Sequence, residues 1–193
     1  SAPIAGVSSN SPVCEGGDIQ LNASGGDFYS WTGPGVLVPN GSVSNPAVNG
    51  ATLGDGGNYT VTITDLFGCT AQITENVVVN SNPILNIVSQ TDVGCAGGSD
   101  GSFTVLASGG AGVPYSYDEN GNQNFDGIFN AYAEGTYTVT VSDLNTCSSS
   151  INVVIGATSI APPGNSITIT SAPASACVGN VIVVTTNAVI GAT

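Results

Sequence analysis

The sequence contains no lysine, arginine or histidine among its 193 residues. Its 13 acidic residues therefore have no side chain with which to form a salt bridge, and the formal net charge is −13. A chain without cations cannot neutralise nucleic-acid phosphates, and it has no side chain suited to proton transfer near neutral pH. These absences argue against a nucleic-acid partner and against an enzyme, and we expect no catalytic residues and no cofactor.

Long hydrophobic runs are also missing. No stretch approaches the roughly 18 uninterrupted apolar residues of a membrane-spanning helix, and the first residues lack the basic and apolar sections of a signal peptide. We therefore expect no membrane insertion by this fragment. The chain begins at Ser1 without Met and ends at Thr193 just after a strand-like run, so we expect both ends to be cuts in a longer protein.

Hydrophobic residues make up 41% of the chain and alternate with polar ones in short runs. Such runs occupy residues 19–24 and 59–64, and again residues 103–108 and 137–142. The 27 glycines and 10 prolines fall largely between the runs, where they indicate turns. No segment has convincing helical spacing, so the pattern predicts an all-β chain.

The chain repeats itself. Residues 58–69 read NYTVTITDLFGC and residues 136–147 read TYTVTVSDLNTC. Cys14 opens CEGGDIQLNASGG, Cys95 opens CAGGSDGSFTVLASGG, and Cys177 opens a shorter third copy. Each unit thus has a cysteine, a strand, a Gly-Gly turn and a later cysteine, which indicates tandem domains of one kind.

The repeat length of about 80 residues suits a sandwich of roughly seven strands and is too long for one coil of a solenoid. The sequence SAPIAGVSSNSPVC at the start is echoed by SAPASAC before Cys177. We therefore predict one sandwich at residues 1–82, a second at residues 83–164, and the truncated start of a third at residues 165–193. The predicted fold is a tandem of immunoglobulin-like or PKD-like β-sandwiches arranged end to end.

A tyrosine corner is predicted at the start of one strand in each unit. In the run DGGNYTV, Asp55, Gly57 and Tyr59 stand at alternate positions entering strand F, as they do in immunoglobulin-like sandwiches. The second unit has Gly135 and Tyr137 at the matching places and an alanine in place of the aspartate. These residues support the immunoglobulin-like assignment.

Two short motif series resemble known repeats. SPVCEGGDIQLNASGG, YSWTGPG and NYTVTITDLFGC are similar to the immunoglobulin- and PKD-like repeats of very large Bacteroidetes surface proteins. CAGGSDGSFTVLASGG, PYSYDENGN and EGTYTVTVSDLNTC resemble the SprB-type repeat of gliding-motility adhesins. The resemblance covers most of residues 10–155. It implies export by a type 9 secretion route, display in long cell-surface filaments, and a role in adhesion or gliding.

The five cysteines indicate disulfides in an oxidising compartment, because the sequence has no CxxC or Cys/His metal pattern. Pairing within units would join Cys14 to Cys69 and Cys95 to Cys147. In an immunoglobulin sandwich, however, a cysteine before strand B and one after strand F lie at opposite ends of the domain, and a disulfide needs Cα atoms within about 7 Å. We therefore favour an interdomain bond from Cys14 to Cys147, and the pairing within units stays open.

On the interdomain hypothesis the three remaining cysteines, Cys69, Cys95 and Cys177, bond to neighbouring repeats. Asp65 and Asp143 each precede a cysteine by four residues. They could help to hold a cation at a domain junction, but capping of the turn after strand F is the simpler interpretation. We expect Asp55 to cap its own corner in the same way.

A calcium site is conceivable in the segment DENGNQNFD, whose oxygen ligands would be Asp118, Asn120, Asn122 and Asp126. The segment departs from an EF-hand loop, because Gln123 stands where the turn glycine is needed. The alternative is a β-hairpin whose turn is Asn-Gly at residues 120–121.

Aromatic residues offer one further candidate site, a carbohydrate-stacking platform. Its members would be Phe28, Tyr29, Trp31, Tyr115 and Tyr117. Strand alternation places about half of them in a core, and Trp31 matches the core tryptophan of strand C.

The tandem of sandwiches predicts a structural stalk or filament, and the resemblance implies that it belongs to a secreted adhesin at the bacterial cell surface. Its expected partners are neighbouring repeats, and surface polysaccharide or other filament chains are further possibilities. The alternatives are a carbohydrate-binding module and a self-assembling filament or surface-layer subunit.

Overall fold

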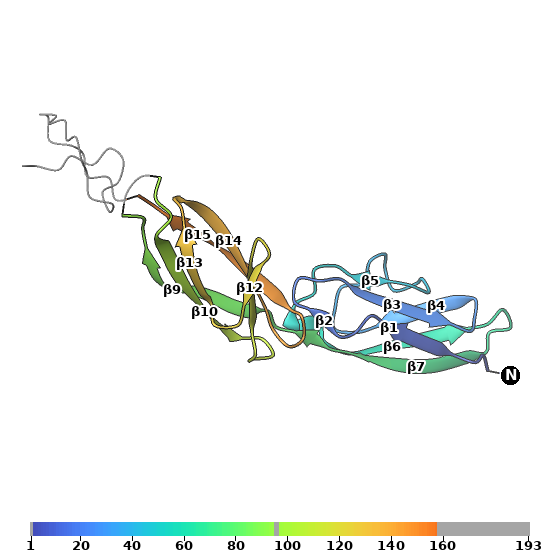
Figure 1. Cartoon of the computed structure of the whole chain (residues 1–193). Helices are drawn as coiled ribbons and strands as arrows, with labels where there is room; N and C mark the ends of the chain where they lie inside the picture. The colour runs from blue at the N-terminus through green and yellow to red at the C-terminus, as the bar shows by residue number, and fades with distance from the viewer. Residues whose placement is uncertain (1, 95–96, 158–193) are drawn as a thin grey trace, which may run out of the picture. The chain divides into compact units, whose positions relative to one another are not determined.

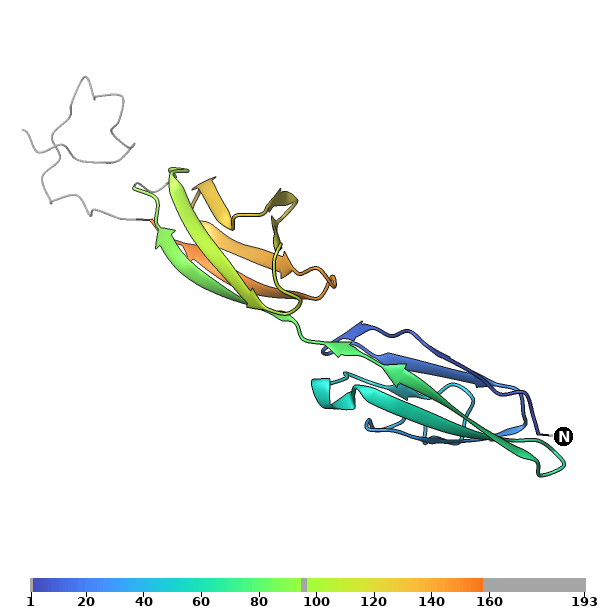
Figure 2. The ribbon, with the colours of Figure 1, turned by 90° about the horizontal axis from the view of Figure 1, so that it is seen from below.

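The computed structural model describes residues 2–94 and 97–157. Within these ranges the chain consists of strands, turns and one short 3-10 helix, so the predicted all-β fold is confirmed (Figures 1 and 2). The predicted third repeat, residues 165–193, lies outside the described residues, as do Cys95 and Cys177.

The first repeat forms two three-stranded sheets, with orders β1-β3-β5 and β4-β6-β7, and a short parallel pair, β2-β8. All other pairings in these sheets are antiparallel. The elements are β1 (Gly6–Ser9), β2 (Val13–Cys14), β3 (Ile19–Ser24), β4 (Phe28–Thr32), β5 (Ala47–Val48), the 3-10 helix η1 (Leu53–Asp55), β6 (Gly57–Thr64), β7 (Thr70–Val77) and β8 (Val79–Asn80).

The second repeat forms one sheet of order β13-β10-β9 and one of order β12-β11-β14-β15. A parallel bridge between Val93 and Ala157 stands where the first repeat has its β2-β8 pair. The elements are β9 (Pro83–Thr91), β10 (Gly101–Gly109), β11 (Ser116–Glu119), β12 (Asn122–Asn124), β13 (Ile128–Tyr132), β14 (Gly135–Ser142) and β15 (Ser148–Ile155).

Both repeats follow the strand order of an immunoglobulin sandwich. Strands A, B and E form one sheet and strands C, F and G the other, and the second repeat adds β12 beside its strand C. In the second repeat, strand F is β14 and strand G is β15. The chain is therefore a tandem of immunoglobulin-like β-sandwiches.

The core of the first repeat is built by strict alternation. In β3, Ile19, Leu21 and Ala23 are buried while the residues between them are exposed. Trp31 on β4 is buried opposite Val61 of β6, where many immunoglobulin domains have a cysteine. The buried residues of β3, on one sheet, form one hydrophobic cluster with Trp31 and Val61, on the other. Burial of apolar surface contributes roughly 25 cal/mol per Å², so this cluster stabilises the packing of the two sheets.

The second repeat fills one end of its core with aromatic rings. Phe103 of β10 stacks on Phe129 of β13 with ring centroids 4.9 Å apart. Tyr132 and Tyr137 meet edge to face at 4.6 Å. Phe103 also lies 6.3 Å from the ring of Tyr137, which joins the β10 sheet to the β14 sheet. Such ring pairs stabilise by about 1 kcal/mol beyond the area that they bury.

The compact units of the chain do not coincide with the two repeats that the sheets define. Among the described residues, one unit comprises residues 2–85, 107–125 and 140–150, and the other comprises residues 86–94, 97–106, 126–139 and 151–157. The first unit therefore includes the strands of the first repeat together with two segments of the second, which hold β11, β12 and the turn between β14 and β15. The strand ladders separate near residue 82, whereas the boundaries 1–82 and 83–164 stay a prediction for the compact domains.

Candidate functional site

The site that joins the two sequence repeats begins at β2. Val13 and Cys14 pair in parallel with Val79 and Asn80 of β8, which fixes the backbone on both sides of the cysteine. The glycine after Glu15, in the sequence CEGG, adopts a positive φ of 87°. This glycine is well suited to the turn because φ in that region is strained for other residues. Cys14 is thus held on a short strand that ends at a tight turn.

The second half of the site is the turn between β14 and β15. Asp143 organises it, because its Oδ1 accepts hydrogen bonds from the backbone N–H groups of Asn145 (2.9 Å) and Cys147 (3.0 Å). The backbone N–H of Asp143 in turn donates to the carbonyl of Cys147 at 3.0 Å. Thr146 adopts a positive φ of 64° within this turn. Asp143 therefore caps the turn, as the sequence predicted, and presents Cys147 in a fixed position.

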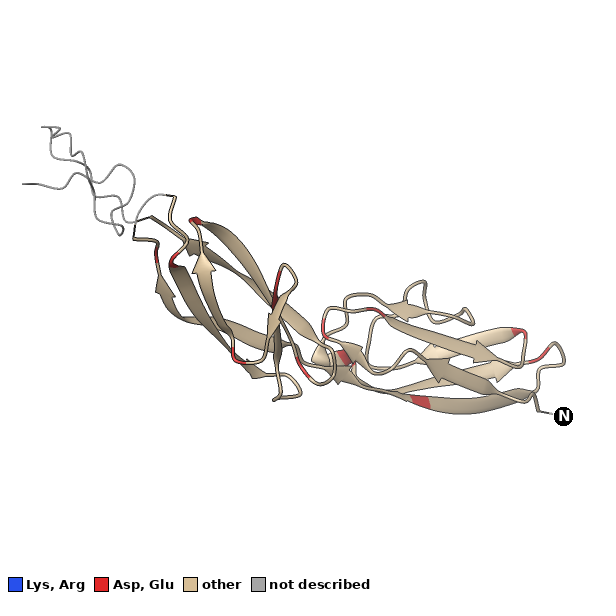
Figure 3. Ribbon diagram, viewed as in Figure 1, with Lys and Arg blue, Asp and Glu red and all other residues tan. Residues whose placement is uncertain are grey.

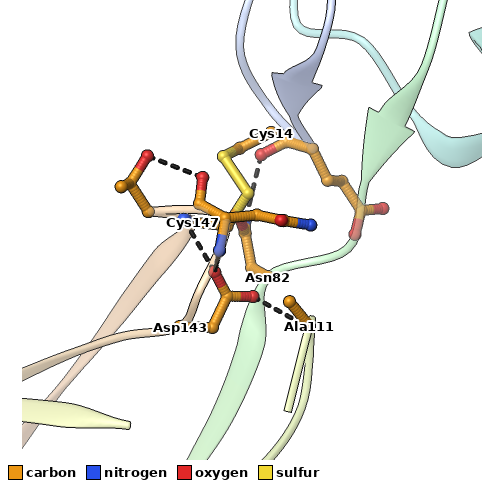
Figure 4. The surroundings of a disulfide bond; sticks show 8 residues. Cys14, Asn82, Ala111, Asp143 and Cys147 are labelled. Atoms are coloured by element: carbon orange, nitrogen blue, oxygen red, sulfur yellow. Dashed lines mark hydrogen bonds between the residues drawn. A yellow bond between two sulfur atoms is a disulfide. The ribbon is translucent and has the colours of Figure 1, made fainter. Parts of the chain in front are cut away.

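Cys14 and Cys147 form a disulfide bond (Figure 4). Their Cα atoms lie 5.4 Å apart, within the range that a disulfide requires, and 133 positions separate them in sequence. The structure thus has the pairing that the sequence analysis favoured. Pairing within one sequence repeat is not present for Cys14, because Cys69 is a free thiol.

Hydrogen bonds from distant parts of the chain surround the disulfide. The second carboxylate oxygen of Asp143 accepts from the backbone N–H of Ala111 at 2.7 Å, and Asp143 is itself only 7% exposed (Figure 4). The side-chain amide of Asn82 donates to the carbonyl of Glu15 at 2.9 Å. Cys147 is fully buried. The bond therefore lies in a packed and hydrogen-bonded setting, which protects a disulfide from reductants.

The free thiol of Cys69 lies in an equivalent turn, between β6 and β7. The Oδ1 atom of Asp65 accepts from the backbone N–H groups of Phe67 and Cys69, both at 2.9 Å, and the backbone N–H of Asp65 donates to the carbonyl of Cys69 at 3.0 Å. Gly68 has a positive φ of 80° at the position that Thr146 holds in the other turn. Cys69 is half-buried, whereas Cys147 is fully buried.

Backbone amides take the place of the missing cations. The acidic residues, red in Figure 3, lie mostly in turns and loops, and only Glu75, Asp118 and Glu119 fall within strands. Each of the nine aspartates accepts a hydrogen bond from at least one backbone N–H. A carboxylate on backbone donors forms a charge-assisted bond, which is stronger than a neutral one. The aspartates therefore act mainly as turn caps.

In two of these caps the hydrogen bonds lower the pKa of the aspartate. Hydrogen bonds from the backbone and then the side chain of Thr52 hold the pKa of Asp55 below its ordinary value. The backbone N–H of Gly156, followed by the side chain of Gln90, lowers the pKa of Asp92 in the same way. Asp55 caps the 3-10 helix η1 as expected, and its side chain stabilises the corner that Tyr59 completes.

Both predicted tyrosine corners are present. The hydroxyl of Tyr59 donates to the carbonyl of Asp55 at 2.8 Å, and that of Tyr137 donates to the carbonyl of Ala133 at 2.9 Å. Tyr59 also accepts from the backbone N–H of Gly35 at 3.1 Å and is fully buried. Burial raises the pKa of Tyr59 above its ordinary value, partly offset by the hydrogen bond from Gly35.

The Gly35 contact was missed by sequence reasoning. Gly33, two residues earlier, lies so close to the Tyr59 ring that a Cβ atom at this position would clash with it. Its sequence signal is the Gly-Pro-Gly run that follows the core tryptophan.

The proposed calcium ligands serve a hairpin instead. β11 pairs with β12 so that Glu119 faces Asn122, and the two residues between them form the turn. Asn120 and the following glycine both have positive φ, 50° and 87°, as a type I′ hairpin requires. Asp118 accepts from the backbone of that turn. The hairpin interpretation is therefore the correct one for this segment.

The side chains of this segment do not form the proposed calcium site. Asp126 lies beyond the hairpin and accepts from the backbone N–H of Ile128 at 3.0 Å. Across residues 2–94 and 97–157, no three acidic or cysteine side chains gather into a group that could hold a metal ion.

The candidate aromatic platform does not form. Trp31, Tyr115 and Tyr117 are buried, and Tyr29 is half-buried. Only Phe28 is well exposed, at 61%. The ring nitrogen of Trp31 donates to the carbonyl of Val43, and the hydroxyl of Tyr117 accepts from the backbone N–H of Ala107. These residues belong to the cores of the two sandwiches.

Comparison with known proteins yields structural likeness only. No family model matches the chain, and no curated protein matches it significantly. The C-terminal fragment of intimin, solved with the intimin-binding domain of its translocated receptor, is 12% identical with a TM-score of 0.48 over 81% of this chain and 64% of its own. The insect immune protein hemolin (12%, 0.44) aligns over 80% of this chain and 46% of its own.

A titin I-band fragment, I67–I69, is also 12% identical, with a TM-score of 0.40 over 81% of this chain and 66% of its own. All three scores lie below 0.5, so the assignment of the fold rests on the strand order of this chain. In the described part of the chain, no helix has the length and hydrophobicity needed to cross a bilayer.

Proposed function

We propose that this chain is a load-bearing repeat region of an extracellular adhesin. The finer identity, a stalk of a bacterial gliding-motility adhesin exported by the type 9 route, is supported by the resemblance of its motifs to SprB-type repeats. The extracellular location is supported by the disulfide, since such bonds persist in oxidising compartments. The proposed role is mechanical and not catalytic.

The observation that carries the proposal is that the disulfide links Cys14, near the N-terminal end of the described chain, directly to Cys147, near its C-terminal end. A force applied to the two ends of the chain enters at residue 14 and leaves at residue 147 through the sulfur–sulfur bond. The segment between the two cysteines is then closed into a loop and cannot be extended. Among the described strands, β2 ends on Cys14, and only β1 and β15 lie wholly outside this loop.

The loop protects most of both sandwiches from force. Strands β3 to β14 lie within it, so the sheets that they form stay together even if β1 and β15 are pulled away. A disulfide placed within either sandwich would protect that sandwich alone. A bond between the repeats therefore suits a protein whose task is to keep its length under tension.

Single-molecule force spectroscopy tests this proposal. The full chain is held through terminal tags and carries serine at Cys69, Cys95 and Cys177, so that a single disulfide can form. Reduction with dithiothreitol is expected to release 133 further positions, which is roughly 440–480 Å of contour length.

The matched control is the same chain with Cys14→Ser and Cys147→Ser. It is expected to extend to the full length without reductant. An oxidised chain that already extends to its full length would overturn the load-bearing role, because the disulfide would then not be closing the loop between residues 14 and 147.

A further inference from the structure

We propose that the turn at residues 65–69 is a docking site for a second repeat of the same kind, which bonds to Cys69 through a cysteine equivalent to Cys14. This inference rests on the proposed function, since it adds a partner to the repeat region. The partner is identified by its chemistry: a short edge strand that carries a thiol and ends at a Gly-Gly turn, as the sequence CEGG does here.

The first argument is that the described residues hold two turns of the same kind, each ending at a cysteine, and that one of these cysteines is already in a disulfide. The turns at residues 65–69 and 143–147 share four hydrogen bonds: two to the aspartate side chain, one from the aspartate N–H to the cysteine carbonyl, and one to the aspartate carbonyl. Residues 68 and 146 both have positive φ. The second turn presents its cysteine to Cys14, so the first presents Cys69 in a backbone geometry already known to receive such a partner.

The second argument is an exposed apolar rim beside Cys69. Phe67 is 93% exposed and Leu66 is 76% exposed, both within the turn itself. Phe28, also exposed, faces Thr64 across the β4-β6 ladder, next to the turn. Ile4 is exposed as well, and its backbone packs against Gly25 in the loop that leads to Phe28. A large apolar rim on a soluble chain is typical of an interaction surface.

Charge favours the same partner. The repeat has no cation to offer, so two such repeats form no side-chain salt bridge, and an uncharged surface is where two acidic repeats can meet with the least repulsion. Asp27 and Asp65 are acidic residues at the rim, and both carboxylates are turned to backbone N–H groups: Asp27 accepts from Leu66 at 3.0 Å, and Asp65 accepts from Phe67 and Cys69 at 2.9 Å. The rim therefore presents side chains that a chain of net charge −13 can contact without a salt bridge.

The bond forms by thiol–disulfide exchange. Two thiols are joined with loss of two protons and two electrons, and oxidised glutathione, the oxidant of the assay, takes up both and leaves as two molecules of reduced glutathione. Equilibration in a glutathione buffer lets the stable pairing be selected among the possible ones.

The experiment mixes two full-length chains, each with one reactive thiol. The acceptor carries Cys95→Ser and Cys177→Ser, so that its disulfide is intact and Cys69 is free. The donor carries serine at Cys69, Cys95, Cys147 and Cys177, so that only Cys14 is free. Circular dichroism first verifies that the donor keeps its β-sheet spectrum. The expected product is a one-to-one heterodimer linked from Cys69 to Cys14, in at least fivefold excess over either homodimer.

The matched control adds Leu66→Ser and Phe67→Ser to the acceptor, which keeps the thiol and removes the part of the apolar rim that lies within the turn. Its heterodimer yield is expected to fall to the statistical level. Peptide mapping must use a protease other than trypsin, because the chain has no lysine or arginine. Homodimers in statistical proportion, or no linked product, would overturn the docking site.

This failure can be told apart from failure of the mechanical role. The force experiment uses a chain in which Cys69 is already serine, so the length released by reduction does not depend on the docking site. A positive force result with statistical dimer yields would leave the load-bearing role standing and remove only the proposed partner.

Discussion

The turns at residues 65–69 and 143–147 have the same backbone but different surroundings. Each is closed by an aspartate that accepts from two backbone N–H groups of its own turn. Asp143 also accepts from Ala111 and is nearly buried, whereas Asp65 is half-buried and its hydrogen bonds with Phe67 and Cys69 stay within its turn. The comparison separates what the five residues of each turn encode locally from what distant parts of the same chain add to the second turn. These additions are a third hydrogen-bond donor, burial and a covalent partner.

The two tyrosine corners differ in the same way. Tyr59 and Tyr137 each donate to a carbonyl four residues earlier, but the loop with Gly33 and Gly35 covers Tyr59 completely. Tyr137 has no such cover and instead packs its ring against Tyr132 and Phe103. The first repeat therefore stabilises its corner with hydrogen bonds, and the second with stacked rings.

The largest difference is expected on removal of the two turn aspartates. Asp143→Ala leaves the backbone N–H groups of Ala111, Asn145 and Cys147 without their acceptor in a nearly buried setting, which should cost roughly 3–4 kcal/mol of unfolding free energy. Asp65→Ala should cost about 1 kcal/mol, because water can reach the freed donors. Urea unfolding of the oxidised chain, followed by the fluorescence of Trp31 and by circular dichroism, measures both.

The isosteric control for this comparison is Asp143→Asn. Its amide oxygen still accepts from Asn145 and Cys147, while its NH₂ group faces the N–H of Ala111, so its cost should lie between the two alanine variants. Equal costs for Asp65→Ala and Asp143→Ala would show that burial contributes nothing to the second turn.

A smaller difference is expected at the tyrosine corners. Tyr59→Phe removes a donor to Asp55 and leaves the N–H of Gly35 facing a buried ring, which should cost about 2–3 kcal/mol. Tyr137→Phe keeps the ring stacking and loses one partly solvated bond, so about 0.5–1 kcal/mol is expected. Chemical denaturation of the two variants side by side checks the order, and a larger effect at Tyr137 would contradict it.

The sequence predicted what is local or repeated. Alternation identified the strands, the run DGGNYTV identified the corner, and the matching segments that end at Cys69 and Cys147 identified equivalent turns. The preference for a Cys14–Cys147 bond over pairing within repeats came from strand direction in a head-to-tail tandem combined with the 7 Å limit on Cα separation, and the structure has that bond. These inferences needed only the order of the strands and their period of two.

Hydrogen bonds between distant parts of the chain could not be predicted. The bond from Ala111 to Asp143 spans 32 positions and that from Gly35 to Tyr59 spans 24, and neither leaves a periodic signal. The same holds for the compact units, since residues 107–125 and 140–150 join the first repeat through tertiary packing. The calcium hypothesis failed for the opposite reason: side-chain oxygens in a short segment first serve the backbone of their own turns.

The smallest predicted effect concerns the ionisation of Tyr59. Burial favours the neutral phenol, so the pKa of Tyr59 lies above the ordinary value of 10.0. The unfolded chain ionises this group first, so its contribution to stability is complete below pH 10 and is lost as the pH rises through the higher folded value. The phenolate absorbance of the chain, minus that of the Tyr59→Phe variant, should therefore titrate above pH 10 and only as unfolding begins. A difference curve with its midpoint at or below 10 would mean that the loop with Gly33 and Gly35 does not cover this ring in solution.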